Sequence, residues 1–355
     1  MIENWFLPLA GFFGGGLLGL ASQAGRFCTH GAIEDVVFGG DSRRLRMAFL
    51  GLALAMGSVF ALSGAGLVDL GSAPLLTRPL SLLSVAAGSF LFGIGMALVG
   101  TCAFGSLARL GGGDLGGLFV AGVVGVTGYS AASGVLGEWL SLSPGRVAPS
   151  AAPEGFAHAL AGVTGLPVAL VGIAIALALA GFVLSDRGFR AERRFLAWSV
   201  VLAVAVVSGW LATGIEASGG VSGASVTGHS FVRPVGETVI AFMTGPTGGT
   251  GFGIGAVLGV VAGGAAGSLA RGTFQWQACD DAGSFKRQVL GAVLMGIGGV
   301  LAFGCTIGQG LTAASALAYS APVAMAGMFA GSWLVLQWMV RGSIAGPLRE
   351  LMGRA

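Results

Sequence analysis

Two cysteines of this sequence, Cys102 and Cys305, occur in similar glycine-rich apolar strings at 93–105 and 296–308. In both strings a glycine follows the cysteine three positions later, and a new apolar stretch begins there. A helix that restarts at such a point directs free backbone N–H groups and the positive end of its dipole toward the thiol. The pattern therefore predicts two anion-binding breaks that need no buried lysine or arginine.

Uncharged hydrogen-bond donors accompany both cysteines. Thr101 precedes Cys102, while Thr306 and Gln309 follow Cys305. Weak binding at several places suits a dianion that must pass through and leave again. The simpler interpretation of each cysteine is a small buried hydrophobic residue. The matched occurrence of the pair favours the anion-path interpretation.

The other two cysteines have different surroundings. Cys28 lies at the inner end of the first apolar run, as a third thiol on a cytoplasm-facing path or as a chance thiol at a helix end. Cys279 stands before Asp280 and Asp281 in a polar segment, and adjacent acids make a thiol less reactive, so we interpret it as incidental. The sequence has no CxxC pair and no Cys/His zinc spacing, so we expect no metal site and no cofactor.

The composition indicates which class of protein must position these residues. Hydrophobic residues make up 54% of the 355 positions and charged residues only 9%, whereas soluble domains average about 25% charged residues. This excludes an ordinary soluble protein and a disordered chain. Glycine occupies 67 positions, and small residues let transmembrane helices approach closely. We predict an all-α polytopic membrane protein surrounded by lipid, without the basic stripe that binds nucleic acid.

Apolar stretches long enough to cross about 30 Å of hydrocarbon predict about nine transmembrane helices. They lie near 7–25, 46–66, 82–108, 115–140, 166–184, 195–215, 250–270, 288–308 and 318–340. A further apolar segment near 236–246 is too short to span. Together with glycine breaks near 100–105 and 304–310, it predicts re-entrant or broken helices, whose free backbone groups must be buried in protein or line a cavity.

The positions of arginine and lysine predict the orientation of the chain. Basic residues cluster in the loops 26–46, 185–194 and 271–287 and in the C-terminal tail. If these segments are cytoplasmic, the nine spans alternate consistently, with the N-terminus outside and the C-terminus inside. The first apolar run lacks the positive n-region of a cleaved signal peptide, so we expect a retained helix.

The two glycine–cysteine strings also indicate an internal repeat. Three glycines and the cysteine match at one constant offset, and the orientation assignment runs the two strings in opposite directions. Inverted repeats place a transporter's substrate site at their interface near the bilayer midplane. The predicted units are an N-terminal membrane repeat at 1–184, a cytoplasmic linker at 185–194 and a C-terminal membrane repeat at 195–355.

Few cations remain on the predicted outer side. Arg78 and Arg233 each precede a proline and then an apolar segment, whereas Arg146 lies in a loose loop. Two arginines at the rim of an outer mouth would concentrate a dianion and speed its capture. The alternative role for them is anchoring at the lipid headgroups. Glu237, one helical turn after Arg233, is assigned to the same mouth.

Three segments resemble those of a known family. Segments 88–109 and 303–311 are similar to the two signature segments of the YeeE/YedE membrane proteins, and Arg26-Phe-Cys28 resembles that family's first cysteine motif. The resemblance extends over nearly the whole chain. One departure is Val99-Gly-Thr101, where the family commonly has glycines directly before the cysteine.

The resemblance implies a bacterial inner-membrane transporter with an inverted-repeat fold that imports thiosulfate or a closely related sulfur anion. By motif match, its path would be lined by Cys28, Cys102, Cys305 and Gln309, and transient S–H···S contacts would pass the anion along without a covalent step. It also implies a small TusA-like sulfur carrier as a cytoplasmic partner. The family includes members assigned to other sulfur or selenium compounds, so sulfite, selenite and polysulfide stay alternative substrates.

Two other classes of function stay open on the sequence. A membrane thiol oxidoreductase would need neighbouring cysteines or a quinone site, and no close cysteine spacing occurs. A non-transporting membrane subunit of a sulfur-processing assembly would show no uptake by itself. We expect a transporter and not an enzyme.

Overall fold

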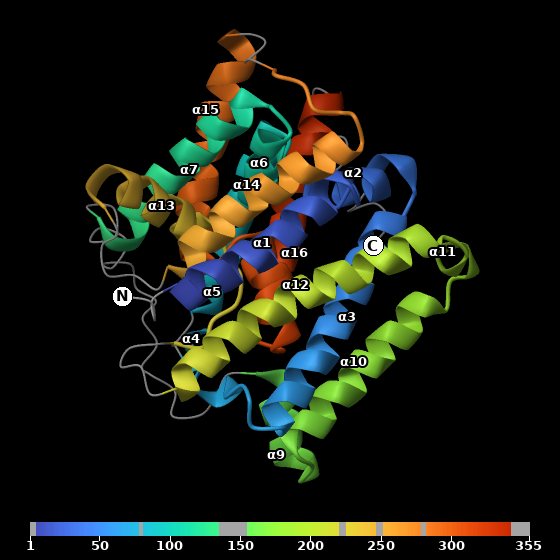
Figure 1. The fold of residues 1–355 in the computed structure, drawn as a ribbon. Helices are drawn as coiled ribbons and strands as arrows, with labels where there is room; N and C mark the ends of the chain where they lie inside the picture. Colours follow the sequence, from blue (N-terminus) through green and yellow to red (C-terminus); the bar gives the residue numbers. More distant parts are fainter. Residues whose placement is uncertain are drawn as a thin grey trace.

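The computed structural model describes residues 5–77, 81–134, 155–219, 225–245, 251–277 and 282–341. Within these ranges the chain is helical, with isolated β-bridges and no strand (Figure 1). The helices and the short π or 3-10 segments (η) are α1 (Phe6–Gln23), α2 (Thr29–Glu34), η2 (Asp35–Gly39), α3 (Arg43–Gly64), η3 (Leu70–Ser72), α4 (Pro74–Thr77), α5 (Leu82–Val99), α6 (Ala103–Gly111), α7 (Leu115–Ser133), α9 (Phe156–Thr164), α10 (Val168–Leu184), α11 (Arg187–Ala191), α12 (Arg193–Ser218), α13 (Val232–Thr244), α14 (Phe252–Ala270), α15 (Ala282–Leu301), η4 (Gly308–Ala313) and α16 (Ser320–Arg341).

Among the described residues, 7 helical segments are long and apolar enough to cross a membrane, namely α1, α3, α5 with α6, α7, α12, α14 and α16. The pair α9–α10 bends by 115° and adds an eighth if it is counted as one span. The predicted segment 288–308 contains most of α15 and the turn after it. The all-α polytopic architecture predicted from the composition is therefore confirmed.

The short apolar segment predicted near 236–246 forms most of α13, a helix of 13 residues. At 1.5 Å per residue a helix of that length covers about 20 Å, which is less than the hydrocarbon core. It packs against α7 and α14, so its backbone is surrounded by protein on that side.

Glycine explains how closely α1 and α14 pack. A Cβ on Gly11, Gly15 or Gly19 of α1 would overlap a backbone carbonyl oxygen of α14. The reverse holds for Gly255 and Gly259 of α14, which face the carbonyl oxygens of α1. Because these glycines recur every four residues along each helix, they form a continuous seam of backbone contact.

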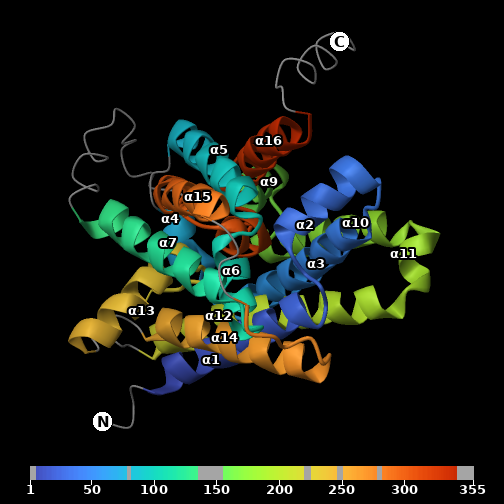
Figure 2. The same ribbon diagram turned by 90° about the horizontal axis from the view of Figure 1, so that it is seen from above.

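Figures 1 and 2 show how the long helices are arranged around the break between α5 and α6. The helix α1 lies beside α14 and α12, while α5 lies beside α15 and α16. The helix α6 contacts α14, α7 and α1, so it joins the two groups. In the break before α6, Thr101 and Cys102 are buried, whereas Gly100 is exposed.

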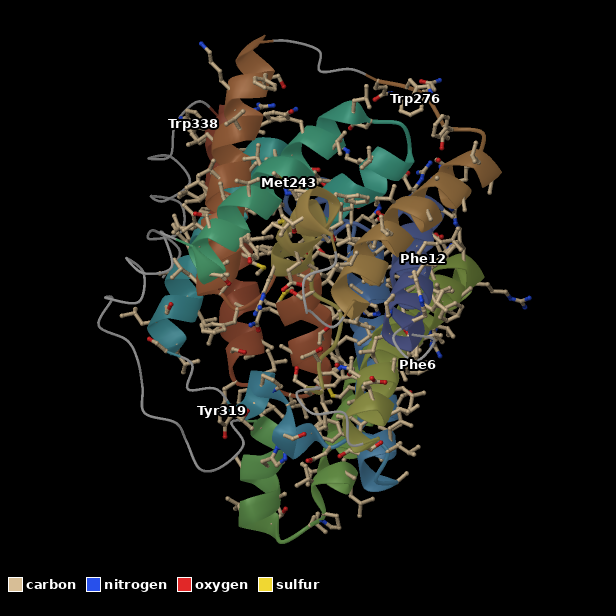
Figure 3. All side chains as sticks on the ribbon, turned by 60° about the vertical axis from the view of Figure 1, so that its left-hand side comes forward. Phe6, Phe12, Met243, Trp276, Tyr319 and Trp338 are labelled. Carbon is tan, nitrogen blue, oxygen red and sulfur yellow. The ribbon has the colours of Figure 1, made fainter. Side chains whose placement is uncertain are left out.

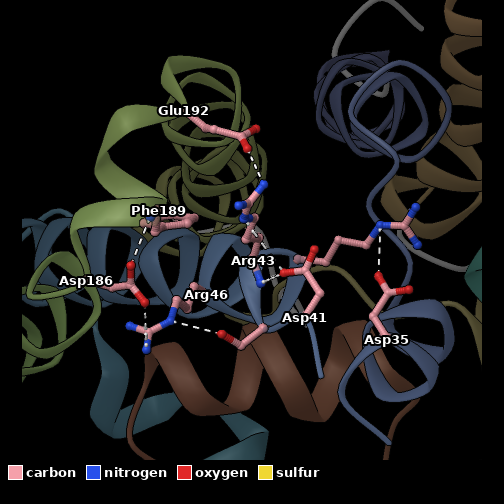
Figure 4. A network of polar contacts seen from close by, with 9 residues as sticks. Asp35, Asp41, Arg43, Arg46, Asp186, Phe189 and Glu192 are labelled. Carbon is pink, nitrogen blue, oxygen red and sulfur yellow. Dashed lines mark hydrogen bonds and ion pairs between the residues drawn. The ribbon is translucent and has the colours of Figure 1, made fainter. Parts of the chain in front are cut away.

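Ion pairs connect the first turn of α3 with the linker around α11 (Figure 4). Arg43 pairs with Glu192 and also with Asp41, while Arg46 pairs with Asp186 at 3.2 Å. Arg44 pairs with Asp35 at 3.2 Å. Three arginines assigned to the cytoplasmic side are therefore matched by acids from their own loop or from the linker.

Aromatic side chains lie toward both ends of the long helices (Figure 3). Trp276 and Trp338, which are 72% and 50% exposed, lie at one end, and Tyr319 lies nearer the other. Aromatic rings are enriched at both membrane–water interfaces, so this placement agrees with a membrane-spanning molecule.

Candidate functional site

Two cysteines cap the N-termini of helices at breaks in the chain. Cys102 is the N-cap of α6, and its Sγ accepts a hydrogen bond from the Gly105 N–H at 3.3 Å. Cys28 is the N-cap of α2, and its Sγ accepts one from the Gly31 N–H at 3.5 Å. The two residues adopt extended backbone conformations, as N-cap residues do.

Cys305 occupies the corresponding position in the second glycine-rich string. The helix α15 ends at Leu301, Phe303 has a left-handed φ of 56°, and the helical backbone resumes after Cys305. The backbone amides of Gly308 and Phe231 face the Cys305 thiol. Cys305 is fully buried, so its thiol has amide donors instead of water around it.

The structure brings the three cysteines together. Cys102 lies within electrostatic interaction range of both Cys28 and Cys305, and its thiol faces the hydroxyl of Thr306. All three are free thiols among the described residues, with Cys28 partly exposed and the other two buried. A row of thiols therefore leads from the buried centre at Cys305, past Cys102, to the more open Cys28.

The polar residues predicted beside the cysteines have unequal roles. The Thr306 hydroxyl is buried and faces the Cys102 thiol. Thr101 is buried and packs beside Gly105. Gln309 is fully engaged: its Nε2 donates to the Ala302 carbonyl at 2.7 Å, and its Oε1 accepts from Ser320 at 3.1 Å.

A cavity of about 170 Å³ lies against the turn that contains Cys305, and it is lined by Phe303 and Gly308 on either side of that cysteine in the sequence. Its walls come from α4, α12, the segment 226–230 and the turn after α15, through Pro74, Leu75, Trp210, residues 226–230, Phe303, Gly308 and Thr312. This cavity was not predicted from the sequence, although the polar run Thr227-Gly-His-Ser230 within an apolar chain is a signal for it.

Threonine side chains hold the cavity wall 226–230 in an extended form. The Thr213 hydroxyl donates to the Thr227 carbonyl at 2.7 Å and accepts from the Thr227 N–H at 3.1 Å. The Thr312 hydroxyl donates to the His229 carbonyl at 2.8 Å. These bonds satisfy backbone groups that a helix would otherwise satisfy itself, as irregular backbone at membrane depth requires.

A buried histidine stands beside the Cys28 break. His30 Nε2 lies 3.3 Å from Glu34 Oε1, and its Nδ1 lies 3.3 Å from the Ser332 hydroxyl of α16. Burial lowers the pKa of His30, and Glu34 acts in the opposite direction while Arg109 adds to the lowering. The ring therefore connects α2 to α16.

The predicted outer mouth is described only in part. Arg233 donates to Glu237 Oε1 at 2.8 Å in an exposed ion pair on α13. Arg78, Arg146 and Cys279 lie outside the described residues. The charge of Arg233 is therefore paired within α13.

Helices long enough to span, two breaks in the centre and thiols at the helix ends define a multi-pass membrane protein with a discontinuous core. The chain matches the family model described as "Sulphur transport" over residues 24–334 and belongs to that family, which confirms the resemblance to the YeeE/YedE proteins. It is 30% identical over 346 residues to a protein named thiosulfate transporter TsuA from Spirochaeta thermophila, covering 95% of this chain and 98% of that protein. It is 26% identical to a protein of the same name from Escherichia coli strain K12, covering 94% of each.

Proposed function

We propose that this chain imports thiosulfate, or a closely related small sulfur anion, along the row of thiols formed by Cys305, Cys102 and Cys28. The observation that carries the proposal is that these three thiols lie together at helix starts with backbone amides directed at them. The names of two relatives that each cover nearly the whole chain point to thiosulfate among the sulfur anions.

The chemistry of the row suits a soft dianion that must keep moving. Amide N–H groups at helix starts attract negative charge, and they do so without a buried cation that would hold a dianion too tightly. A thiol is a weak donor, so each S–H···S contact is easily exchanged for the next. Binding at several weak places allows conduction, and no bond to sulfur needs to form or break.

The cavity beside Cys305 is the natural entrance to this row. An anion held there would be next to Gly308, whose N–H also faces the Cys305 thiol. The direction from cavity to Cys28 is the direction of import when the basic loops face the cytoplasm. The proposal therefore places the chain in a bacterial inner membrane, with its N-terminus outside and its C-terminus in the cytoplasm.

Helix packing supports the proposed inverted repeat of 1–184 and 195–355, joined by the linker 185–194. The pair α1–α14 corresponds to α12–α3, and the pair α5–α16 corresponds to α15–α7. All four pairs pack together, as do α6–α7 and their counterparts η4–α16. Exchanging the halves maps Cys102 onto Cys305, so the proposed path lies at the repeat interface.

The cytoplasmic partner proposed from the family resemblance is a small TusA-like sulfur carrier, with membrane lipid around the helices. Arg43, Arg44 and Arg46 are already paired with acids of this chain. Arg194 donates to the Ala24 carbonyl at the end of α1 at 2.6 Å. An acidic carrier would therefore have to rely on other basic side chains of the inner loops, such as Arg193.

Uptake of labelled thiosulfate by proteoliposomes that contain only the purified chain tests the proposal. We expect uptake that excess unlabelled thiosulfate competes away and that Cys305→Ala abolishes. No uptake by the folded protein would favour a non-transporting subunit of a larger assembly. A Cys102–Cys305 disulfide that forms and breaks during turnover would instead favour a thiol oxidoreductase.

A further inference from the structure

Aromatic rings form a continuous column beside the thiols. The ring centroids of Phe27 and Phe104 lie 6.4 Å apart, and those of Phe104 and Phe231 lie 5.3 Å apart. The column continues through His229, 6.4 Å from Phe231, to Phe252, 5.0 Å further. All five side chains are buried, although they come from separate parts of the sequence.

The first three rings of the column follow the same order as the three thiols. Phe27 directly precedes Cys28, and Phe104 stands in the first turn of α6, which Cys102 caps. The backbone amide of Phe231 faces the Cys305 thiol. Cys28 and Cys102 therefore each have a phenyl ring within two residues in the sequence, whereas the ring beside Cys305 comes from Phe231, a residue distant in the sequence. The three rings follow one another at centroid distances of 6.4 and 5.3 Å.

The amides of the path create a need for a barrier against other anions. A helix N-terminus attracts any small anion, because its N–H groups and dipole recognise charge and not sulfur. Chloride would enter the outer cavity on these grounds alone. Selection of one anion over chloride must then come from a barrier to hydrated ions. An apolar constriction forms such a barrier because water does not fill it.

We propose that Phe27, Phe104 and Phe231 form the ion-tight seal of this path and thereby determine its specificity. A hydrated chloride ion would have to lose its water among these rings without gaining an equivalent partner, which is costly. An anion with a soft sulfur atom exchanges water for thiol contacts instead, and the positive edges of phenyl rings tolerate its charge. The identity of the permitted anion rests on the proposed function, but the seal against chloride does not.

The test measures chloride efflux from chloride-loaded proteoliposomes, with a potassium ionophore to balance charge and no thiosulfate present. We expect the parent protein to be tight and Phe104→Ala to raise the leak by about tenfold, equivalent to about 1.4 kcal/mol off the barrier. Phe104→Leu keeps an apolar side chain of similar reach and should stay close to the parent. Phe27→Ala, in the turn before α2, provides a second opening of the column should Phe104→Ala fail to fold.

The matched control is Phe60→Ala. Phe60 is as deeply buried as Phe104, but it packs over Gly172 between α3 and α10, away from the thiols. A parental leak in folded Phe104→Ala and Phe27→Ala, or an equal leak in Phe60→Ala, would overturn the seal. Thiosulfate uptake by the parent protein is measured separately. If the parent takes up no thiosulfate but Phe104→Ala leaks chloride, the proposed seal is supported and the proposed substrate is wrong.

Discussion

At the scale of single residues, Cys102 and Cys305 are the side chains on which the proposed path depends. We expect Cys102→Ala and Cys305→Ala each to lower thiosulfate uptake by more than about tenfold, which corresponds to about 1.4 kcal/mol or more in the barrier. Serine should restore little, because its harder hydroxyl matches sulfur poorly. The measurement is initial uptake normalised to folded protein, with Cys279→Ala as the control. Full uptake in both alanine variants would contradict the path.

Gln309 has a different part at the same scale, because its amide bridges the two sides of the break after α15. Gln309→Ala leaves the buried Ala302 carbonyl and the Ser320 hydroxyl without this partner. We expect a loss of about 1–3 kcal/mol in the free energy of unfolding, measured by thermal denaturation in detergent. If stability is unchanged while uptake falls, Gln309 contacts the anion and does not support the break.

At the scale of helices, the seam between α1 and α14 makes a prediction about glycine. In Gly15→Ala the new methyl group would overlap the backbone of Ala256, so the helices must separate at a cost of about 1–3 kcal/mol. Gly181 on α10 has no atom within 4 Å of its ideal Cβ, and Gly181→Ala should be neutral or stabilising by up to about 1 kcal/mol. The yield of folded protein and its melting temperature distinguish the two. Equal melting temperatures of the two variants would show that close packing of α1 against α14 does not determine stability.

The contact between α2 and α16 should depend on pH through His30. Because burial lowers its pKa, the folded protein holds this ring neutral where the unfolded chain, with a pKa of about 6.5, takes up a proton. The contribution of the neutral His30 to the free energy of unfolding is therefore fully present above about pH 7, and it decreases as the pH falls through about 6.5. Melting temperatures of the parent and of His30→Gln at about pH 7.5 and about pH 5.5 measure this. An equal pH dependence in both would assign it to other groups.

The breaks in the helices were predictable from sequence because their causes are local. A glycine that ends one helix and a Cys-x-x-Gly that starts the next are read directly at Cys102 and Cys305. Cys28 has the same Cys-x-x-Gly spacing, but the sequence analysis used only its place at a helix end and did not predict this third cap. The column of Phe27, Phe104 and Phe231 was not predictable, because these rings meet only through tertiary packing. The helix α9, which meets α10 at a bend of 115°, was likewise not predicted, because the apolar pattern indicated only the span 166–184.

At the scale of the whole molecule, charge is placed at the two ends and kept out of the path. On the side predicted to be cytoplasmic, the ion pairs of Arg43, Arg44 and Arg46 stabilise the first basic loop, and through Glu192 and Asp186 they connect it to the linker. Arg271 donates to the Gln23 carbonyl at 2.7 Å, and Arg194 donates to that of Ala24. Cations thus meet the negative end of α1, which stabilises its C-terminus.

The outer end gives the last prediction, because there Arg233 is paired with Glu237. The two side chains are 60% and 33% exposed, so water screens both charges. We expect Glu237→Gln to free the charge of Arg233 and raise uptake at limiting thiosulfate by about twofold, the size expected for one charge acting across about 8 Å of water. Arg233→Gln and Arg78→Gln should lower uptake by a similar factor, with a smaller loss at saturation, because a charge at the mouth affects capture and not passage.

Arg146→Gln is the control for this pair, since a cation in a loose loop should contribute little. Raising the ionic strength should remove the differences among the variants, because exposed charges are screened over about 8–10 Å at physiological salt. Salt-insensitive uptake at limiting thiosulfate, together with parental behaviour of Glu237→Gln and Arg233→Gln, would leave the rim arginines as interface anchors. In that case capture would begin at the amides around the outer cavity, deeper than any charged side chain of the mouth.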